Sequence, residues 1–266
     1  MNEHKINIHA FRAMKQRGEK IVALTAYDFF TAKIMDEVGV HLILVGDSVG
    51  MAVLGYENTL PVTMEEMIHH TKAVARAKPK ALLVADLPFM SYASVRTALE
   101  NAGRLIQAGA EAVKVEGGES VAEQVRALVA SGIPVLGHIG LLPQSILETG
   151  GYKIQGRTPQ SAERVLQDAQ MLEKAGVFAM VIEGTVARVA EQVTKSVTVP
   201  TIGIGAGVNC DGQVLVSNDM LGLFTWFTPK HVKRYANLAE EMRKAFAAYK
   251  RDVESGKFPE AGQSFQ

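Results

Sequence analysis

Eight short apolar segments recur along the chain, and each leads into a longer stretch with the apolar spacing of a helix. The segments cover residues 21–27, 41–47, 81–87, 112–116, 133–139, 178–184, 200–207 and 213–219. Regular alternation of buried strands and amphipathic helices is typical of βα units in a parallel sheet. Eight such units predict an α/β fold, a closed (β/α)8 TIM barrel, and a chain of 266 residues with 47% hydrophobic content suits one such domain.

The intervening helices carry conventional start and stop signals. Thr63 followed by Glu66 is the pattern of a capping box, and Ser120 followed by Glu123 repeats it. Several helical stretches stop at an Ala-Gly pair, as at Gly176, and glycine favours the left-handed backbone of a helix C-cap. These signals predict helices that turn back into the next strand.

Two connections are unusually long, residues 48–63 after the second strand and residues 140–159 after the fifth. Loops of that length in a compact domain are commonly functional or disordered, and these follow the strand ends where barrel enzymes place their chemistry. After the last strand, an amphipathic stretch at about 229–251 predicts an added C-terminal helix that packs on the barrel or on a partner subunit. We expect one domain, residues 1–266, ending in a short mobile tail.

Composition and charge limit the classes of binding partner that the sequence indicates. Lys plus Arg and Asp plus Glu are equal at 28 each, so no basic surface indicates nucleic acid or an anionic membrane, and a small-molecule partner is expected. The lone Cys210 excludes an internal disulfide, and clusters of Cys and His that would indicate zinc are absent. The N-terminus has no apolar leader segment, and no apolar run reaches the length of a membrane span. The sequence predicts a cytoplasmic protein.

Carboxylic acids end four of the predicted strands, at Asp47, Asp86, Glu116 and Glu183. Strands buried on both faces should be nearly all apolar, so these acids are exceptions gathered at one end of the barrel. The second, third and fourth strands are neighbours about 4.8 Å apart, so Asp47, Asp86 and Glu116 can converge on one point. Oxygen ligands favour Mg²⁺, which keeps its waters, so one of the three is expected to act through water. The alternative is neutralisation by basic side chains, for which Lys114 is the nearby candidate.

Glu183 and Lys114 have distinct expected roles. Glu183, on the sixth strand across the barrel from the trio, suits a general base, and the alternative is a cap for the helix that starts near Thr185. Lys114 lies two residues before Glu116, so both side chains point to the same face of the strand. An inward Lys114 would meet a substrate carboxylate or form a Schiff base, and the adjacent carboxylates argue for the charged form.

A few further residues are weaker candidates for the functional site. His138 supplies a donor or acceptor, or is a core histidine bonded to backbone, and Ser48 supplies a hydroxyl, or only shapes its turn. The stretch GIGAGVNCDG, residues 203–212, resembles a phosphate-binding loop but lacks the G-x-G-x-x-G spacing, and close backbone packing explains it equally well. His69 and His70 are expected on a helix surface.

Long sequence blocks carry a family resemblance over nearly the whole chain. The blocks are KQRGEKIVALTAYD, LVGDSVGMAVLGYENTLPVTMEEMIHHTKAV, VADLPF, AVKVEGG, GHIGLLPQS, GGYKIQGRT, VIEG and TIGIGAGVNCDGQVLV. By their length and order, the sequence resembles the ketopantoate hydroxymethyltransferase family, also called the 3-methyl-2-oxobutanoate hydroxymethyltransferases.

The resemblance implies an enzyme that moves a hydroxymethyl group from 5,10-methylenetetrahydrofolate to 3-methyl-2-oxobutanoate, through a Mg²⁺-stabilised enolate. The product, 2-dehydropantoate, begins pantothenate and coenzyme A biosynthesis, and family members are typically homodecamers. By the family pattern Asp47 and Asp86 bind Mg²⁺, with Glu116 completing the site, and Glu183 is the proton acceptor. The residues that fall where the family contacts the keto acid are Asp47, Ser48, Asp86, Lys114 and His138. From the residues alone, a Mg²⁺-dependent barrel lyase or mutase acting on another α-keto acid is the competing interpretation, and a non-catalytic binding module is the other.

Overall fold

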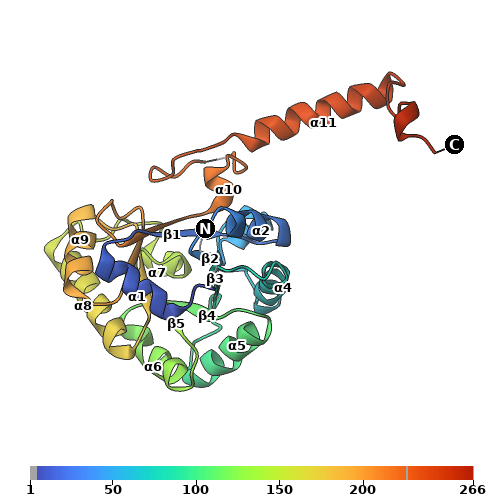
Figure 1. Ribbon diagram of the computed structural model, residues 1–266. Helices are drawn as coiled ribbons and strands as arrows, with labels where there is room; N and C mark the ends of the chain where they lie inside the picture. Colours follow the sequence, from blue (N-terminus) through green and yellow to red (C-terminus); the bar gives the residue numbers. More distant parts are fainter. Residues whose placement is uncertain (1–4, 226, 266) are drawn as a thin grey trace. The chain divides into compact units, whose positions relative to one another are not determined.

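A computed structural model describes residues 5–225 and 227–265, and the chain forms two compact units that divide between Val216 and Ser217. The first unit is a closed barrel in which β1 to β8 pair in sequence order, all parallel, and β8 closes on β1 (Figure 1). The strands are β1 Ile21–Thr25, β2 Leu42–Val45, β3 Leu82–Asp86, β4 Ala112–Glu116, β5 Val135–Gly140, β6 Ala179–Glu183, β7 Thr201–Ile204 and β8 Gly212–Leu215. The predicted TIM barrel is confirmed.

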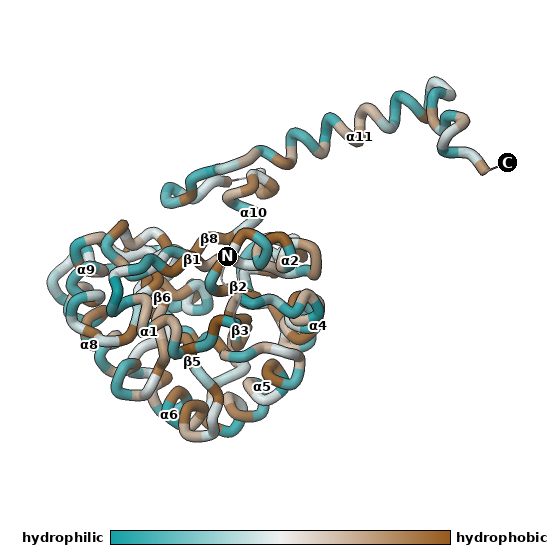
Figure 2. The backbone as a smooth tube through the Cα atoms, viewed as in Figure 1, coloured by the Kyte–Doolittle hydropathy of each residue, from teal (hydrophilic) through white to brown (hydrophobic). Residues whose placement is uncertain are grey.

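Helices form a ring outside the strands, and along them hydrophobic and hydrophilic residues alternate (Figures 1 and 2). In the first unit they are α1 Ile8–Arg17, α2 Phe29–Glu37, α3 Val49–Ala52, α4 Met64–Ala75, α5 Val95–Gln107, α6 Ala122–Ala130, α7 Ile146–Thr149, α8 Pro159–Ala175 and α9 Ala187–Ser196. Two 3-10 turns join them, η1 Glu119–Val121 and η2 Pro143–Ser145. The two long connections therefore contain short helical segments, α3 after β2, and η2 with α7 after β5.

One predicted capping box is confirmed and the other is wrong. At α4 the Thr63 hydroxyl accepts from the Glu66 amide, and the Glu66 carboxylate accepts from the Thr63 amide. The Ser120 box does not form, because Ser120 lies inside η1 and α6 begins at Ala122 without a side-chain cap. The turn is set instead by α8, since the Glu119 amide donates to Asp168 Oδ1 at 3.0 Å.

The barrel interior follows the period of two expected for strands. Apolar side chains that point inward from the strands pack into one cluster with side chains of α1, which closes the N-terminal end of the barrel. The members of this inner cluster include Phe11, Met14, Ile21, Ala23, Leu42, Leu44, Leu82, Val84, Ala112, Leu136, Ala179, Val181, Ile202 and Val214. Residues at the alternate positions pack outward against the helices. The filled lower barrel leaves the C-terminal strand ends as the place for polar residues.

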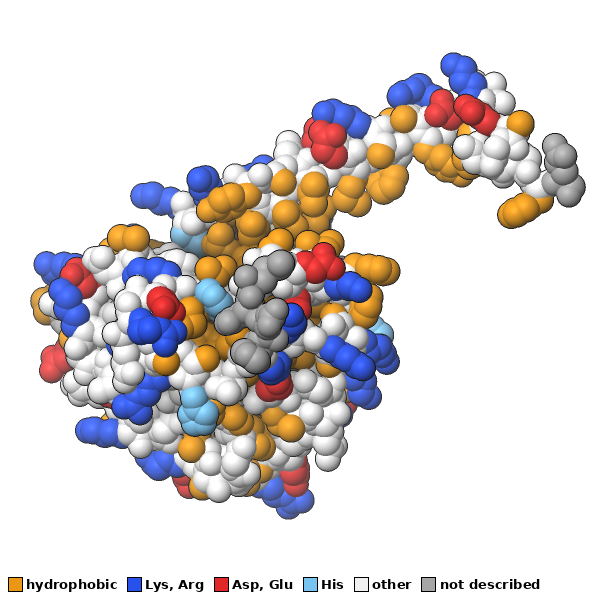
Figure 3. Space-filling model, in the orientation of Figure 1, with side chains coloured by type: hydrophobic (Ala, Val, Ile, Leu, Met, Phe, Trp, Pro, Cys, Tyr) orange, Lys and Arg blue, Asp and Glu red, His pale blue; other side chains and the backbone are white. Residues whose placement is uncertain are grey.

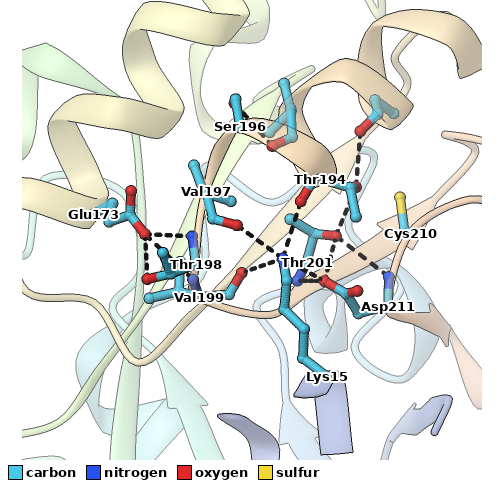
Figure 4. Close-up of polar contacts among 12 residues, drawn as sticks. Lys15, Glu173, Thr194, Ser196, Val197, Thr198, Val199, Thr201, Cys210 and Asp211 are labelled. Carbon is cyan, nitrogen blue, oxygen red and sulfur yellow. Dashed lines mark hydrogen bonds and ion pairs between the residues drawn. The ribbon is translucent and has the colours of Figure 1, made fainter. Parts of the chain in front are cut away.

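A partly buried ammonium group, Lys15 of α1, lies at the N-terminal ends of β7 and β8 (Figure 4). Its Nζ donates to the carbonyl oxygens of Thr194, Val197 and Val199 at 2.9 to 3.0 Å and is 3.0 Å from Asp211 Oδ2. Three of these oxygens belong to the end of α9 and the turn after it, where helix carbonyls lack intrahelical partners. Lys15 therefore ties α1 to the base of the barrel.

The other polar side chains around Lys15, which together with it form the lower cluster, hydrogen-bond to one another. Asp211 Oδ2 accepts from the Thr201 amide at 2.8 Å and from the Thr201 hydroxyl at 3.1 Å. The Thr201 hydroxyl in turn lies 2.8 Å from the Thr194 hydroxyl, which donates to the Ala190 carbonyl (Figure 4). The result is a closed hydrogen-bond network without spare donors for a ligand.

The second unit contains α10 Ser217–Met220, α11 Leu238–Glu254 and the 3-10 turn η3 Ala261–Gln263. The added helix thus starts nine positions later than the predicted 229, because the amides of Tyr235 and Leu238 donate to Met220 and Leu221 instead of continuing a helix. Exposed apolar side chains gather along one side of α11 (Figure 3). They are Leu238, Met242, Phe246, Tyr249 and Val253. No helix within the described ranges has the length and apolar character needed to cross a membrane.

Candidate active site

The inward stripes of β3 to β6 change from apolar to polar at their C-terminal ends. Asp86 follows Leu82 and Val84 on the inner face of β3, and the same alternation places the other polar side chains at the same level. These are Lys114 and Glu116 on β4, His138 on β5 and Glu183 on β6. All except Glu183, whose side chain is 21% exposed, are buried.

Gly46 occupies the corresponding inward position after β2. A Cβ built there would lie 2.7 Å from Ser48 Oγ and 3.5 Å from Asp86 Oδ2, so a side chain at this position would crowd the carboxylate. The absence of a side chain lets the backbone approach, and the Asp47 amide donates to Asp86 Oδ2 at 3.0 Å. The backbone of Asp47 therefore lies against the Asp86 carboxylate.

Lys114 lies between Asp86 and Glu116. Its Nζ is 2.7 Å from Asp86 Oδ1 and 3.5 Å from Glu116 Oε1. Burial alone lowers the pKa of this ammonium, but the carboxylates of Asp86, Glu116 and Asp47 outweigh burial and raise the pKa above its usual range. A permanently charged Lys114 is suited to holding an anion and unsuited to forming a Schiff base.

His138 lies between two carboxylates from the neighbouring strands. Its Nδ1 is 3.3 Å from Glu116 Oε1 and its Nε2 is 3.3 Å from Glu183 Oε2, although neither nitrogen has hydrogen-bond alignment. Burial lowers the pKa of the imidazole, but the charge of Glu116 reverses the effect and the pKa rises to about 9. His138 is thus cationic near neutral pH and contacts carboxylates, whereas a core histidine would bond to backbone.

Glu116 is the most fully compensated of the acids. Burial raises its pKa, but the charges of His138 and Lys114 outweigh burial and lower the pKa to about 2. Its Oε1 faces Lys114 and His138, and its Oε2 accepts from the Gln144 amide at 3.0 Å. Both oxygens are therefore already engaged.

Asp47 is the least compensated of the acids. Burial, followed by the charges of Asp86 and Glu116, raises the pKa of its carboxyl well above the usual range. Four acids, with Glu183 beside His138 counted, share only two cationic groups, Lys114 and protonated His138, so acidic groups are in excess. A cation at this position would remove the imbalance.

Glu183 is connected to the other acids through His138 rather than standing apart on the opposite wall. It ends β6, where its carbonyl accepts from the Leu141 amide at 2.9 Å. The alternative role as a helix cap is wrong, because α9 begins at Ala187 and its N-cap, Val186, has no side-chain hydrogen bond. The carboxylate remains partly exposed beside the buried imidazole.

Ser48 has a hydroxyl partner at the same edge of the site. Its Oγ lies 2.8 Å from the Tyr27 hydroxyl, and the Tyr27 carbonyl lies 2.7 Å from His70 Nδ1. His70 is therefore partly buried against the end of β1, while His69 is exposed as predicted. The serine does more than shape its turn, because a second hydroxyl fixes it.

Two side chains in this site escaped the sequence analysis, Gln144 in η2 and Tyr92 in the connection after β3. Gln144 Nε2 donates to Asp47 Oδ2 at 2.9 Å, and the Tyr92 hydroxyl donates to Gln144 Oε1 at 2.6 Å. Only the block GLLPQS pointed toward Gln144, because Pro143 favours the first turn of a helix and would direct the next amide into the site. Nothing in the sequence near Tyr92 indicated its position.

A metal would find oxygen ligands here but no completed set. Among residues 5–225 and 227–265, no group of three or more His, Cys, Asp or Glu side chains is arranged as a metal site. Asp86 Oδ1 is buried without an aligned hydrogen bond, and Asp47 has an unbalanced charge, so these two carboxylates fit a hard divalent ion such as Mg²⁺. The sequence left open that Lys114 neutralises the acids. Lys114 does pair with Asp86, but it shares its single charge with Glu116 and so neutralises Asp86 only in part.

The glycine-rich stretch after β7 packs closely against the rest of the barrel. A Cβ on Gly207, whose φ is +85°, would lie 2.6 Å from Ala187 Cβ, and one on Gly203 would lie 3.0 Å from Cys210 Sγ. Close packing therefore accounts for these glycines, as the alternative interpretation held.

Comparison with known proteins shows the family. The sequence profile of the family described as ketopantoate hydroxymethyltransferase matches residues 5–261. The 3-methyl-2-oxobutanoate hydroxymethyltransferase of Syntrophus aciditrophicus is 55% identical over 263 residues, which is 98% of this chain and 97% of the relative. The enzyme of the same name from Moorella thermoacetica is 55% identical over 264 residues, 98% of each chain.

Solved structures with the same fold are more distant in sequence. Phosphonopyruvate hydrolase, in a complex with oxalate and Mg²⁺, has a TM-score of 0.65 at 16% identity and covers 97% of this chain and 93% of its own. A 2,3-dimethylmalate lyase of the PEP mutase/isocitrate lyase superfamily has a TM-score of 0.63 at 16% identity, with 92% and 88% covered. At this identity the likeness is one of fold alone.

Proposed function

The chain belongs to the ketopantoate hydroxymethyltransferase family, and from that premise we propose that it transfers a hydroxymethyl group from 5,10-methylenetetrahydrofolate to 3-methyl-2-oxobutanoate. The product would be 2-dehydropantoate, which places the reaction at the start of pantothenate and coenzyme A biosynthesis. Assembly as a homodecamer stays a prediction of the family resemblance, and a cytoplasmic location stays a prediction from the sequence.

One observation supports this chemistry above the others: oppositely charged groups converge at the C-terminal strand ends, and the acidic groups among them outnumber the cationic ones. A small α-keto acid anion and a divalent cation together match such a site, because the keto acid meets cationic donors and the cation meets carboxylates. The donors are Lys114 and His138, and the carboxylates are Asp47 and Asp86.

In this proposal Asp47 and Asp86 hold Mg²⁺, and Glu116 takes part through water because both of its oxygens already have partners. When bound, Mg²⁺ would polarise the keto group and stabilise the negative charge that develops on its oxygen. The hydrogen bond from the Asp47 amide to Asp86 Oδ2 supports this proposal, because it holds the two residues side by side.

Lys114, His138 and Ser48 orient the keto acid. Lys114 offers a compact positive charge inside the barrel, His138 offers charged N–H donors, and Ser48 offers a hydroxyl fixed by Tyr27. Holding both reactants in line is worth a large part of the barrier in a bimolecular reaction. These groups exist in one geometry because neighbouring strands fix their backbones.

Glu183 accepts the proton from C3 of the keto acid. Its carboxylate stands 3.3 Å from His138 Nε2, so a base lies next to the group that orients the substrate, and its partial exposure leaves room for the substrate to approach. Loss of this proton leaves the electron pair that forms the new carbon–carbon bond to the one-carbon unit. The two carbon–nitrogen bonds of that unit to the folate break, water supplies the hydroxyl group, and the proton from C3 and one from water go to the nitrogens of tetrahydrofolate.

The fold alone would equally allow a lyase or mutase acting on another α-keto acid, as in the distant structural relatives. The direct experiment follows the formation of tetrahydrofolate from methylenetetrahydrofolate and 3-methyl-2-oxobutanoate, with Mg²⁺ and with excess chelator. We expect turnover only with all three components. Turnover of the keto acid without the folate would favour the lyase or mutase, and no turnover with all three would overturn the proposal.

A further inference from the structure

Gln144 makes four hydrogen bonds that join three strand ends to the connection after β5. Its Nε2 donates to Asp47 Oδ2 at 2.9 Å and to the Leu87 carbonyl at 3.0 Å. Its backbone amide donates to Glu116 Oε2 at 3.0 Å. Its Oε1 accepts from the Tyr92 hydroxyl at 2.6 Å. Every polar group that this buried side chain carries therefore has a partner.

These partners allow the amide only one orientation. The Leu87 carbonyl is purely an acceptor, and the Tyr92 hydroxyl lies 2.6 Å from Oε1, closer than its other acceptor, the Glu116 carbonyl at 3.3 Å. Turning the amide by half a rotation would face Oε1 toward the Leu87 carbonyl, which cannot donate, and would break that bond. Burial raises the pKa of the Tyr92 hydroxyl, followed in effect by the charge of Glu116, so the hydroxyl keeps its proton.

The fixed amide in turn fixes the Asp47 carboxylate. Asp47 Oδ2 is held by Gln144, and the Asp47 backbone amide is held by Asp86. No described residue donates a hydrogen bond to the second oxygen, Asp47 Oδ1. The side chain is thus immobilised through one oxygen while the other is left available.

We propose that Gln144 is a positioning residue that holds Asp47 Oδ1 ready for the divalent cation, and that Tyr92 sets the orientation of the Gln144 amide. The proposal rests on the proposed function, because it takes Asp47 as a ligand of that cation. Hydrogen-bond partners of metal-binding side chains commonly change metal affinity by about 10- to 100-fold when they are removed. Gln144 therefore makes the connection after β5 part of the metal site without touching the metal.

The test is calorimetric titration with Mg²⁺ in the presence of saturating 3-methyl-2-oxobutanoate, without folate, so that no turnover occurs. Gln144→Met keeps the length of the side chain and removes its polar atoms. Tyr92→Phe removes only the hydroxyl. Gln124→Met is the matched control, because the Gln124 amide also contacts Tyr92, at its carbonyl, 3.3 Å away, yet does not reach Asp47.

We expect Gln144→Met to weaken Mg²⁺ binding by about 10- to 100-fold, Tyr92→Phe to weaken it less, and Gln124→Met to leave it unchanged. A purely structural role would lower the melting temperature while the folded fraction kept its affinity for Mg²⁺. Affinity within twofold of wild type in Gln144→Met would overturn the proposal and leave the proposed function standing. Failure of the wild-type protein to bind Mg²⁺ would overturn both. If Gln144→Met does not fold, Tyr92→Phe supplies the test, and an unchanged affinity of that variant for Mg²⁺ overturns the proposal.

Discussion

Each end of the barrel has a lysine surrounded by oxygen atoms, Lys15 partly buried at one end and Lys114 buried at the other, and their partners differ. At the N-terminal end, Lys15 donates to three carbonyls and pairs with Asp211, and the surrounding hydroxyls satisfy one another. At the C-terminal end, Lys114 faces several carboxylates at unequal distances, 2.7 Å from Asp86 and 3.5 Å from Glu116. In the lower cluster, the groups around Lys15, the polar atoms hydrogen-bond to one another. In the upper cluster, the charged groups around Lys114, acids are in excess and the ring nitrogens of His138 have no aligned hydrogen bond.

The difference separates stability from function. A buried polar network in which every group is paired makes the fold rigid and unique, whereas one with unmatched groups is costly unless a ligand completes it. Both clusters contain a lysine paired with an aspartate, so an ion-paired lysine alone does not mark a catalytic group. The unmatched carboxylate and imidazole groups at the upper end distinguish it as the site.

The largest effect on turnover is expected from a substitution in the upper cluster. Asp86→Asn keeps the shape of the side chain but removes a charge that both Lys114 and the cation require. We expect Mg²⁺-dependent turnover to fall by about 10⁴-fold, since metal stabilisation of a developing charge is worth several kcal/mol. Steady-state assays across Mg²⁺ concentrations measure it, and near-normal turnover of the variant in excess chelator would exclude a metal role for Asp86.

A smaller effect separates proton transfer from binding within the upper cluster. Glu183→Gln keeps the size of the side chain and removes its basicity, so we expect turnover to fall by about 10³-fold while binding of 3-methyl-2-oxobutanoate persists. Calorimetry measures the binding and steady-state assays measure the turnover. Loss of both together would instead assign Glu183 to substrate binding.

The lower cluster should respond in stability and not in rate. Lys15→Met removes hydrogen bonds from a charged donor, so we expect the free energy of unfolding to fall by about 2 kcal/mol with kcat unchanged. Denaturant unfolding measures the first and steady-state assays the second. Lys195→Met is the matched control, because its side chain is 74% exposed and its ion pair with Glu191 should contribute less than about 0.5 kcal/mol. A large fall in kcat for Lys15→Met would erase the distinction between the two ends.

The smallest expected effect contrasts two histidines. At the upper end the pKa of His138 is raised, whereas burial lowers the pKa of His41 at the start of β2, where Nδ1 accepts from the Val22 amide. The unfolded chain therefore binds a proton at position 41 more readily than the folded chain does. The stability that neutral His41 contributes is present above its ordinary pKa of 6.5 and is lost as the pH falls below it.

His41→Asn should remove that loss and still accept from the Val22 amide. Urea midpoints of wild type and variant, compared between about pH 5 and about pH 8, measure the change, since this range brackets histidine titration. Parallel curves for the two proteins would show that His41 does not titrate differently on folding.

Periodicity explains why so much of the site was predictable. Alternation along β3 and β4 places Asp86, Lys114 and Glu116 on the inner face, and adjacent strands bring their ends together, so the sequence predicted their convergence. The helix boundaries that depend on local pairs were less secure. Next to Ser120, the hydrogen bond from the Glu119 amide to Asp168 of α8 outweighed the local capping signal.

Residues in the irregular connections were beyond sequence reasoning. Gln144 and Tyr92 lie outside the strands, and they meet only because the connections after β3 and β5 fold over the same strand ends. No periodic pattern encodes such a meeting, since it depends on the conformation of both loops at once. The same holds for the contact between Ser48 and Tyr27.

Deuterium exchange at C3 of 3-methyl-2-oxobutanoate, followed by NMR in heavy water with Mg²⁺ and without folate, tests the division between the two ends most directly. It isolates proton removal from carbon–carbon bond formation and compares both clusters in one assay. Wild type and Lys15→Met should exchange at equal rates per folded molecule, and Glu183→Gln should not exchange. Exchange that survives in Glu183→Gln, or that is lost in Lys15→Met, would contradict the assignment of catalysis to the upper cluster alone.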